Sequence, residues 1–291
     1  MKHVLLTGGT GFIGRNLKEA LQKDYLIFSP SHKELELLDE TAVCDYVKKN
    51  QIDIIIHAAI HVPMVNGQKQ EYYNDMRMFL NLKKSSTMVE KFLYFGSGAE
   101  YDKRYDIRMV QEEAIGESIP VTEYGLAKYT MNEIARQSDN IYNLRLFGIF
   151  GKYELFYLKF ISNLCCKAVY ELPLSIRKDC WFDFLYIEDL SPIVKWFIEN
   201  VPEWHDYNVC SGQEYLLTKL ADKVLAQSGK KLPVQLLCDE RNLDYSASNA
   251  RLKNEIPELH ITEMDRAVKE LYSYYEGIKD RIDRSRLAES R

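Results

Sequence analysis

The chain has 291 residues, of which 46% are hydrophobic and 28% are charged, and its net charge is −5. This length and composition fit a folded α/β domain with or without a smaller companion, and the 20 tyrosines argue against a disordered chain. A mildly acidic protein has no general affinity for nucleic acid or for anionic membranes, so we expect neither as a partner.

The cysteines bear on metal binding and compartment. Six are scattered along the chain and only Cys165 and Cys166 are adjacent, which fits neither a disulfide scaffold nor a zinc site. We therefore expect reduced thiols, no metal and a cytoplasmic protein. We also expect no signal peptide and no membrane span, since no apolar run approaches the ~20 residues that a span needs.

Strands and helices alternate through the first half of the sequence. Helical spacing predicts helices at 13–22, 40–49, 70–89 and 123–138, and apolar runs predict strands at 4–7, 25–28, 52–57, 92–97 and 142–147. Such alternation implies right-handed βαβ crossovers. The expected fold class is α/β, with a Rossmann-type doubly wound parallel sheet that binds NAD(P) over residues 1–150.

After Gly151 the alternation is less regular. Residues 155–169 and 188–200 have helical spacing, 184–187 resemble a strand, and 264–275 form an amphipathic helix. From His205 onward the other segments are short. We expect a smaller C-terminal substrate-binding region over 151–291, from which the chain returns once to the sheet near 182–203.

A glycine-rich turn follows the first strand and opens the first helix. Residues 8–14 contain both GxGxxG and GxxGxxG. Glycines there permit a tight turn and close backbone approach to a pyrophosphate, while the free N–H groups of the helix start face the anion. This position inside a βαβ unit favours a dinucleotide site. The predicted cofactor contacts are Gly8, Gly11, Phe12, Ile13 and Gly14.

The end of the second strand bears on the choice of cofactor. NAD enzymes usually carry Asp or Glu there, on the ribose 2′-OH, whereas here the first acid is Glu34, which we expect to face solvent. The preceding hydroxyl and basic side chains suit a 2′-phosphate better. We therefore expect NADP(H), with NAD(H) as the alternative, and contacts from Ser29, Ser31 and Lys33.

Tyr124 and Lys128 begin a predicted helix four residues apart, so both side chains can point into one cleft. A free tyrosine has a pKa of about 10, and we expect the nearby cation to lower the pKa of Tyr124. The pair can exchange a proton with a hydroxyl or carbonyl while a cofactor moves a hydride. Ser97 ends a strand at the edge where ligands bind and can hydrogen-bond the reacting oxygen. We predict all three as catalytic residues.

The glycine turn, Ser97 four residues before Tyr101, Tyr-x-x-x-Lys and their order resemble the extended short-chain dehydrogenase/reductase family, in particular its nucleotide-sugar epimerases, dehydratases and reductases. The resemblance runs from residue 1 to about 215. It implies a nicotinamide cofactor and a nucleotide-sugar substrate. It also places Asp39 at the adenine and adds Ala58, Ala59 and Asn74 to the cofactor site.

Family members commonly dimerise through two helices, which correspond here to 70–89 and 123–138. The resemblance therefore implies a homodimer. The apolar residues expected to form its interface are Met76, Phe79, Leu80, Tyr129, Met131 and Ile134.

Several positions depart from the family motifs. Gly98 and Ala99 replace the Asp-Glu pair of the 4,6-dehydratases, and Ala99 replaces the cysteine of fucose-synthase-like members, whose second acid–base residue falls near Lys159. The resemblance thus disfavours elimination and double epimerisation. Gly148 stands where the family has a substrate-binding asparagine, and Phe182 where it has an arginine on the diphosphate. Candidate replacements for that arginine are Arg177, Lys178 and Arg251. The predicted substrate contacts are His61, Ser97, Gly98, Ala99, Gly148 and Arg177.

Three functions follow from these residues. The first is NADPH-dependent reduction of a 4-keto group on a nucleotide-linked deoxysugar, with Tyr124 as proton donor, Lys128 on the nicotinamide ribose and Ser97 on the carbonyl oxygen. The second is a 4-epimerase that holds NAD and uses the same residues. The third is a non-catalytic NAD(P)-binding regulator, which the retained Tyr–Lys pair disfavours.

Overall fold

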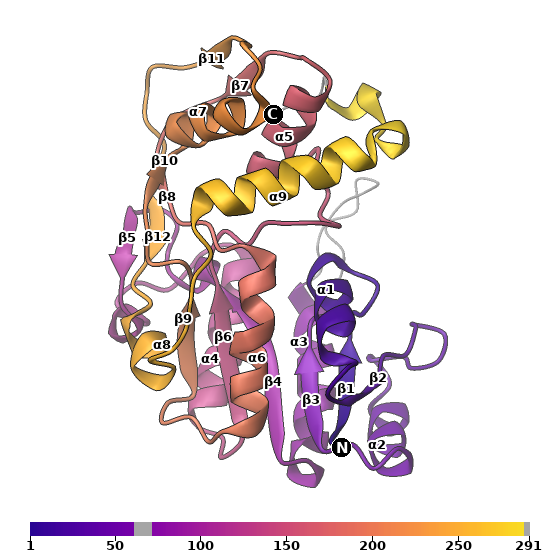
Figure 1. The fold of residues 1–291 in the computed structure, drawn as a ribbon. Coiled ribbons are helices and arrows are strands. Elements are labelled where there is room, and N and C mark those ends of the chain that lie inside the picture. Colours follow the sequence, from indigo (N-terminus) through magenta and orange to yellow (C-terminus); the bar gives the residue numbers. More distant parts are fainter. Residues whose placement is uncertain (61–71, 288–291) are drawn as a thin grey trace.

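The structure is a computed structural model that describes residues 1–60 and 72–287. Within these residues the central sheet has six parallel strands in the order β2-β1-β3-β4-β6-β9 (Figure 1). The strands are β1 His3–Thr7, β2 Leu26–Phe28, β3 Ile54–His57, β4 Lys91–Ser97, β6 Ile141–Leu146 and β9 Asp206–Val209. Because β2 and β3 lie on opposite sides of β1, the direction in which strands are added reverses between β1 and β3. In such sheets a ligand binds in the crevice at the carboxyl ends of the two strands where the order reverses.

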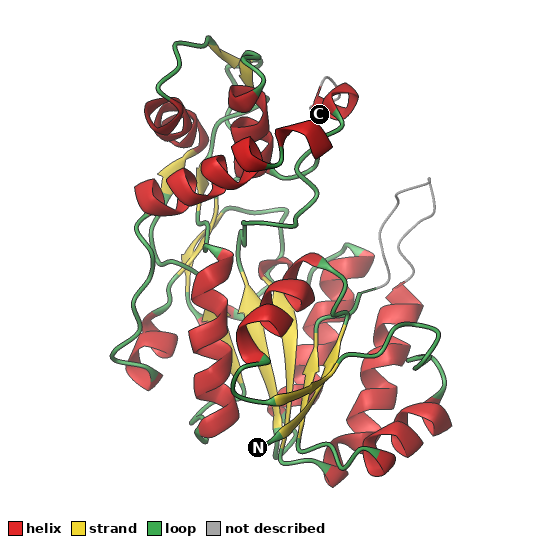
Figure 2. Cartoon of the chain, turned by 45° about the vertical axis from the view of Figure 1, so that its right-hand side comes forward, coloured by secondary structure: helices red, strands yellow, loops and turns green. Residues whose placement is uncertain are grey.

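Helices cover both faces of the sheet (Figure 2). One face carries α1 Phe12–Leu21 and α6 Leu190–Glu199, and the other carries α2 Glu40–Lys49, α3 Tyr72–Ser85 and α4 Glu123–Arg136. Burial on both faces explains the apolar run Ile54-Ile55-Ile56, in which alternate side chains enter opposite cores. The expected Rossmann-type doubly wound sheet is confirmed.

The second half of the chain builds a smaller layer above the carboxyl edge of the sheet (Figure 1). Its helices α5 Phe160–Val169, α7 Leu217–Ser228 and α9 Met264–Gly277 pack on one another. A second sheet has the order β10-β8-β12-β5, with β10 Tyr215–Leu216, β8 Trp181–Phe182, β12 Tyr245–Ala247 and β5 Ile107–Val110. The remaining elements are β7 Leu174–Ile176, which pairs with β11 Val234–Leu236, and α8 Ala250–Glu255 beside β9.

Some expected elements differ in the second half. Residues 184–187 are not a strand: Tyr186 forms an isolated bridge with Phe150, and Ile187–Asp189 is a 3₁₀ turn. These residues are apolar because Phe184 and Tyr186 pack on the Phe150 ring, with centroids 6.1 and 5.5 Å away. Helix α5 begins at Phe160 rather than at 155, and α7 was not expected. The segment that returns to the sheet consists of α6 and β9.

Two of the residues expected at a dimer surface belong to the subunit core. Phe79 and Met131 are buried between the sheet, α3 and α4. The apolar side chains that these helices do expose include Leu80 and Leu126, each 38% accessible. All six cysteines are free thiols. Within the described chain, no helix combines the length and apolarity that crossing a membrane requires.

Candidate active site

The glycine turn fits a pyrophosphate by its shape and polarity. A Cβ on Gly14 would lie 2.2 Å from the Gly8 oxygen, and a Cβ on Gly8, where φ is +71°, would lie 2.6 Å from the Ala59 nitrogen. Both positions therefore require glycine. Gly11 is the N-cap of helix α1, which has no capping side chain and no acid in its first turn. Its first N–H groups and the positive end of its dipole are thus available to an anion.

The residues around this turn lie close to it. Phe12 and Ile13 form the half-buried start of α1, and Ala58 and Ala59 leave β3 beside Gly8. Ser29 also faces the turn, because a Cβ on Gly9 would meet its Oγ.

The loop after β2 carries both hydroxyl and charged side chains. Ser31, Lys33 and Glu34 are exposed. Glu34 faces solvent, as expected, and its carboxylate also accepts hydrogen bonds from the Ser31 nitrogen at 2.7 Å and the Ser31 Oγ at 2.8 Å. These bonds lower the pKa of Glu34. An acid therefore occupies the Ser31 donors that we expected to meet a 2′-phosphate.

Two other predicted cofactor residues lie at helix starts, and one substrate residue is not described. Asp39 is the N-cap of α2, where its Oδ1 accepts a hydrogen bond from the Ala42 nitrogen at 3.0 Å. This bond stabilises α2 independently of any contact between Asp39 and an adenine. Asn74 is half-buried in the first turn of α3. His61 lies outside the described residues.

The structure brings Ser97, Tyr124 and Lys128 together at the carboxyl end of β4. Thr122 caps α4 by accepting a hydrogen bond from the Gly125 nitrogen at 3.1 Å, which fixes the helix start beside Ser97. The Tyr124 phenol lies beside the Ser97 hydroxyl. The Lys128 Nζ donates to the Phe95 oxygen at 2.9 Å and lies 6.0 Å from the centroid of the Tyr124 ring.

The protonation of this trio differs from the expectation. Burial raises the pKa of Tyr124 to about 12, opposed by the hydrogen bond with Ser97. Burial also lowers the pKa of Lys128, opposed by the charges of Asp75 and Glu100. The expected lowering of the Tyr124 pKa by Lys128 is not found, because burial of the phenol is the largest influence on that pKa. At neutral pH Tyr124 therefore carries its proton, which is the form that can donate to a carbonyl oxygen.

Comparison with known proteins places this site in a family. The sequence matches the NAD dependent epimerase/dehydratase family over residues 4–210. The chain belongs to this family. It is 28% identical over 257 residues to GDP-L-colitose synthase of Yersinia pseudotuberculosis, an alignment that covers 78% of this chain and 83% of the relative. The resemblance seen in the sequence is thus confirmed.

Solved structures of nucleotide-sugar enzymes share the fold of the chain. A GDP-L-fucose synthetase from Naegleria fowleri bound to NADP superposes with a TM-score of 0.85 at 17% identity, covering 96% of this chain and 94% of that one. A GDP-mannoheptose C4 reductase from Campylobacter jejuni with NADP bound gives 0.80 at 17% identity, with 94% and 98% coverage. At these identities the likeness establishes the fold.

Two departures from the epimerase/dehydratase motifs are adjacent in space. A Cβ on Gly148, where φ is +42°, would lie 2.0 Å from the Asp183 oxygen and 2.9 Å from the Phe182 ring. The asparagine of the family therefore does not fit here. Phe182 stacks on Phe184 with centroids 4.5 Å apart. Gly148 and the Phe182 ring thus stand in place of the polar pair of the motif.

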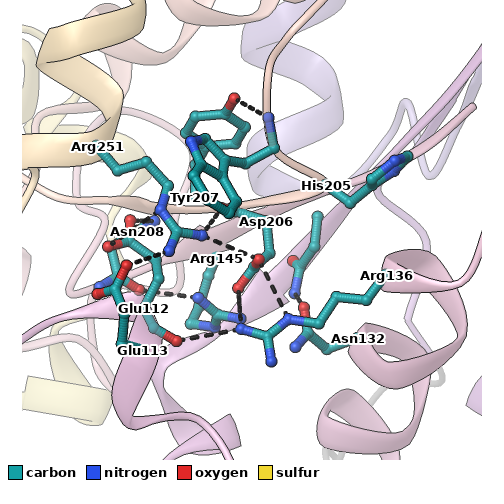
Figure 3. A network of polar contacts seen from close by, with 12 residues as sticks. Glu112, Glu113, Asn132, Arg136, Arg145, His205, Asp206, Tyr207, Asn208 and Arg251 are labelled. Atoms are coloured by element: carbon teal, nitrogen blue, oxygen red, sulfur yellow. Dashed lines mark hydrogen bonds and ion pairs between the residues drawn. The ribbon is translucent and has the colours of Figure 1, made fainter.

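The three basic residues considered for the diphosphate lie in different places. Arg177 is exposed just after β7, and Lys178 pairs with Glu240 at 2.6 Å. Arg251 is engaged elsewhere, because it binds Asp206 at 3.1 Å (Figure 3). Asp206 is level with Asn143 and Tyr94, in the middle of the sheet rather than at its carboxyl edge.

Sequence reasoning missed a buried polar network on the α4 face of the sheet. Arg145 is fully buried on β6 and donates to Glu100 at 2.6 Å. It also donates to Asp206 at 2.9 Å and to Asn208 at 3.0 Å (Figure 3). Glu100 also accepts a hydrogen bond from the Ser97 nitrogen at 3.0 Å. The network therefore holds the backbone of a predicted catalytic residue. The sequence feature that could have predicted the network is Arg145 itself, because a charged residue inside a strand buried on both faces needs a buried partner.

Sequence reasoning also missed Tyr245 and Lys103. Tyr245 lies on β12, and its phenol reaches the Ser97 hydroxyl. The Lys103 Nζ lies 4.7 Å from the centroid of the Tyr245 ring. No local motif marks either residue, because the contact joins segments from the two halves of the chain.

Proposed function

We propose that the protein reduces a 4-keto group on a nucleotide-linked deoxysugar with NADPH. The observation that carries this proposal is the grouping of Ser97, a protonated Tyr124 and Lys128 at the sheet edge, next to an anion-binding glycine turn. The names of the relatives support a guanosine diphosphate sugar, since they include a GDP-L-colitose synthase and a GDP-mannoheptose C4 reductase.

The chain supplies acid–base chemistry and positioning, and a bound nicotinamide cofactor supplies the hydride. Tyr124 donates the proton to the reacting oxygen. Ser97 accepts a hydrogen bond from the Ala99 nitrogen at 3.2 Å, which leaves its own O–H free to donate to that oxygen. Lys128 holds the ribose of the nicotinamide half.

We expect stoichiometric oxidation of NADPH when the protein meets a GDP-linked 4-keto-6-deoxyhexose. The product should carry a new hydroxyl at C4 and, in deuterated water, no deuterium at C3 or C5, because Ala99 provides no acid–base group. Absorbance of NADPH and mass spectrometry of the sugar measure both. Interconversion of a nucleotide sugar without net NADPH consumption would instead establish an epimerase, and cofactor binding without turnover a regulator.

We expect NADPH to bind more tightly than NADH, because the side chains of Ser29, Ser31 and Lys33 follow β2, where we propose that the 2′-phosphate lies. Lys33→Glu should weaken NADPH binding about two- to fivefold, the range of an exposed ion pair, and leave NADH binding unchanged. Glu34→Gln is the matched opposite change: it removes the carboxylate from Ser31 and should strengthen NADPH binding. Fluorescence titration gives the dissociation constants. Equal or reversed affinities of the wild type would contradict the proposal.

We also propose a homodimer through the exposed parts of α3 and α4. Leu80 and Leu126 provide apolar surface for a symmetric contact, whereas Phe79 and Met131 do not take part. A cytoplasmic location is proposed because the six cysteines are free, which suits a reducing compartment.

A further inference from the structure

We propose that Tyr245 belongs to the active site, where its phenol hydrogen-bonds with the Ser97 hydroxyl and positions it toward the substrate oxygen. The expected effect of Tyr245 on turnover rests on the proposed function, whereas the contact between Tyr245 and Ser97 does not. Tyr245 comes from the C-terminal region, and it joins that region to the predicted catalytic edge of the sheet.

The backbone and neighbours of Tyr245 fix its ring. Tyr245 pairs with Ile107 of β5 and Phe182 of β8. Its main-chain carbonyl oxygen accepts a hydrogen bond from the Asp183 main-chain nitrogen at 3.0 Å. Its ring lies 4.9 Å from the rings of both Phe147 and Phe182, measured between centroids. The residue is 9% exposed. A side chain packed in this way has little freedom to point elsewhere.

The position of the phenol explains the glycine at 98. A Cβ on Gly98 would lie 2.3 Å from the Tyr245 Oη and 2.5 Å from a ring carbon of Phe147. Any side chain at 98 would therefore displace the phenol. Gly98 was expected to contact substrate, but the space beside its Cα is filled by Tyr245 and Phe147.

Ser97 thus stands between two phenols. Its hydroxyl lies beside the phenol of Tyr124 and beside that of Tyr245. Burial raises the pKa of Tyr245, which keeps its proton on the phenol. In the proposed arrangement the Tyr245 O–H and the Ala99 N–H both donate to the Ser97 oxygen, because a serine oxygen accepts two hydrogen bonds and donates one. The single Ser97 hydrogen is then directed to the other side, where Tyr124 and the reacting oxygen lie.

Loss of the Tyr245 hydroxyl leaves Ser97 free to rotate. The reacting oxygen is then held less well in the transition state, so kcat should fall more than KM rises. Tyr245→Phe keeps the packed ring and removes only the hydrogen bond, so the fold should be retained. We expect kcat to fall about fivefold to tenfold, the range for one lost hydrogen bond, with NADPH affinity unchanged.

The matched control is Tyr272→Phe. Tyr272 is also a buried tyrosine of the C-terminal region, and its hydroxyl has no hydrogen-bond partner in the described chain. This variant should keep the wild-type kcat. If Tyr245 acts through Ser97, the double variant Ser97→Ala/Tyr245→Phe should be no slower than Ser97→Ala alone. The positioning role would be overturned if the double variant had a lower kcat than Ser97→Ala by the factor seen for Tyr245→Phe alone. A wild-type kcat for Tyr245→Phe would overturn it as well.

A second measurement needs no substrate. In protein labelled with ¹³Cζ-tyrosine, Ser97→Ala should move the resonances of both Tyr124 and Tyr245 and leave that of Tyr272 in place. An unmoved Tyr245 resonance overturns the assignment of Tyr245 to the site. If both resonances move but the wild type reduces no nucleotide keto-sugar, then the proposed function fails while the assignment of Tyr245 to this site stands.

Discussion

Tyr124→Phe is expected to lower kcat by about 10²- to 10⁴-fold while leaving cofactor affinity unchanged. The substitution removes the proton donor and keeps the ring, so the packing of α4 on the sheet is retained. Because the phenol is protonated up to a pKa of about 12, the wild-type donor is available throughout the neutral range. Steady-state kinetics with NADPH and the keto-sugar, combined with cofactor titration, measure both quantities.

The neighbouring residues provide the comparison for that result. Tyr129→Phe alters another half-buried tyrosine of α4 and should keep normal turnover. Lys128→Ala should lose turnover and also some cofactor affinity, and Ser97→Ala should be milder because the proton donor remains. A folded Tyr124→Phe variant with near-normal reduction would end the hypothesis. Equal losses of thermal stability in all three variants would indicate a structural role instead.

The first half of the fold was predictable because its signals are local. Apolar runs such as 54–56 indicate strands buried on both faces, and the glycine turn fixes the order strand, turn, helix. Once parallel strands are placed side by side, their carboxyl ends meet at one edge. The grouping of Ser97 with Tyr124 and Lys128 then follows from a strand end and one helical turn.

The second half was harder to predict because its segments are short and pair over long distances. Strand β12 lies between β5 and β8, and these three strands come from distant parts of the chain. Their pairing places Tyr245 at Ser97. No periodicity records such a contact. Residues 184–187 were misassigned because aromatic packing on Phe150 produces the same apolar run as a buried strand. Helix α7, by contrast, has Leu217, Leu220, Ala221 and Val224 at helical spacing and was detectable.

The network around Arg145 also depends on residues distant in sequence. Its partners Glu100 and Asp206 come from the turn after β4 and from β9. Sequence alone indicates that a charge within a buried strand needs a partner but does not identify it. The partner matters for function because Glu100 also holds the Ser97 nitrogen at 3.0 Å.

Arg145→Met should destabilise the protein by about 3–5 kcal/mol, the usual cost of removing one partner of a buried ion pair. Asp206 keeps Arg136 at 3.0 Å and Arg251 at 3.1 Å, so its charge stays compensated. Glu100 keeps Asn143 and the Ser97 nitrogen but loses the guanidinium at 2.6 Å. The control is Arg136→Met, a partly exposed arginine on the same aspartate, which should cost about 1 kcal/mol or less.

The pH dependence of the destabilisation caused by Arg145→Met should identify the Glu100 carboxylate as its source. Burial already raises the pKa of Glu100 above its usual 4.5, and Arg145 is the largest influence that lowers it. Without Arg145 the folded protein binds this proton more tightly than the unfolded chain does. Stability of Arg145→Met therefore falls as pH rises above the unfolded pKa, so its deficit should be larger at about pH 8 than at about pH 5. Adding Glu100→Gln should remove this difference. Urea unfolding at both pH values measures it, and a deficit that is the same at both would place the destabilisation in lost packing rather than in an uncompensated carboxylate.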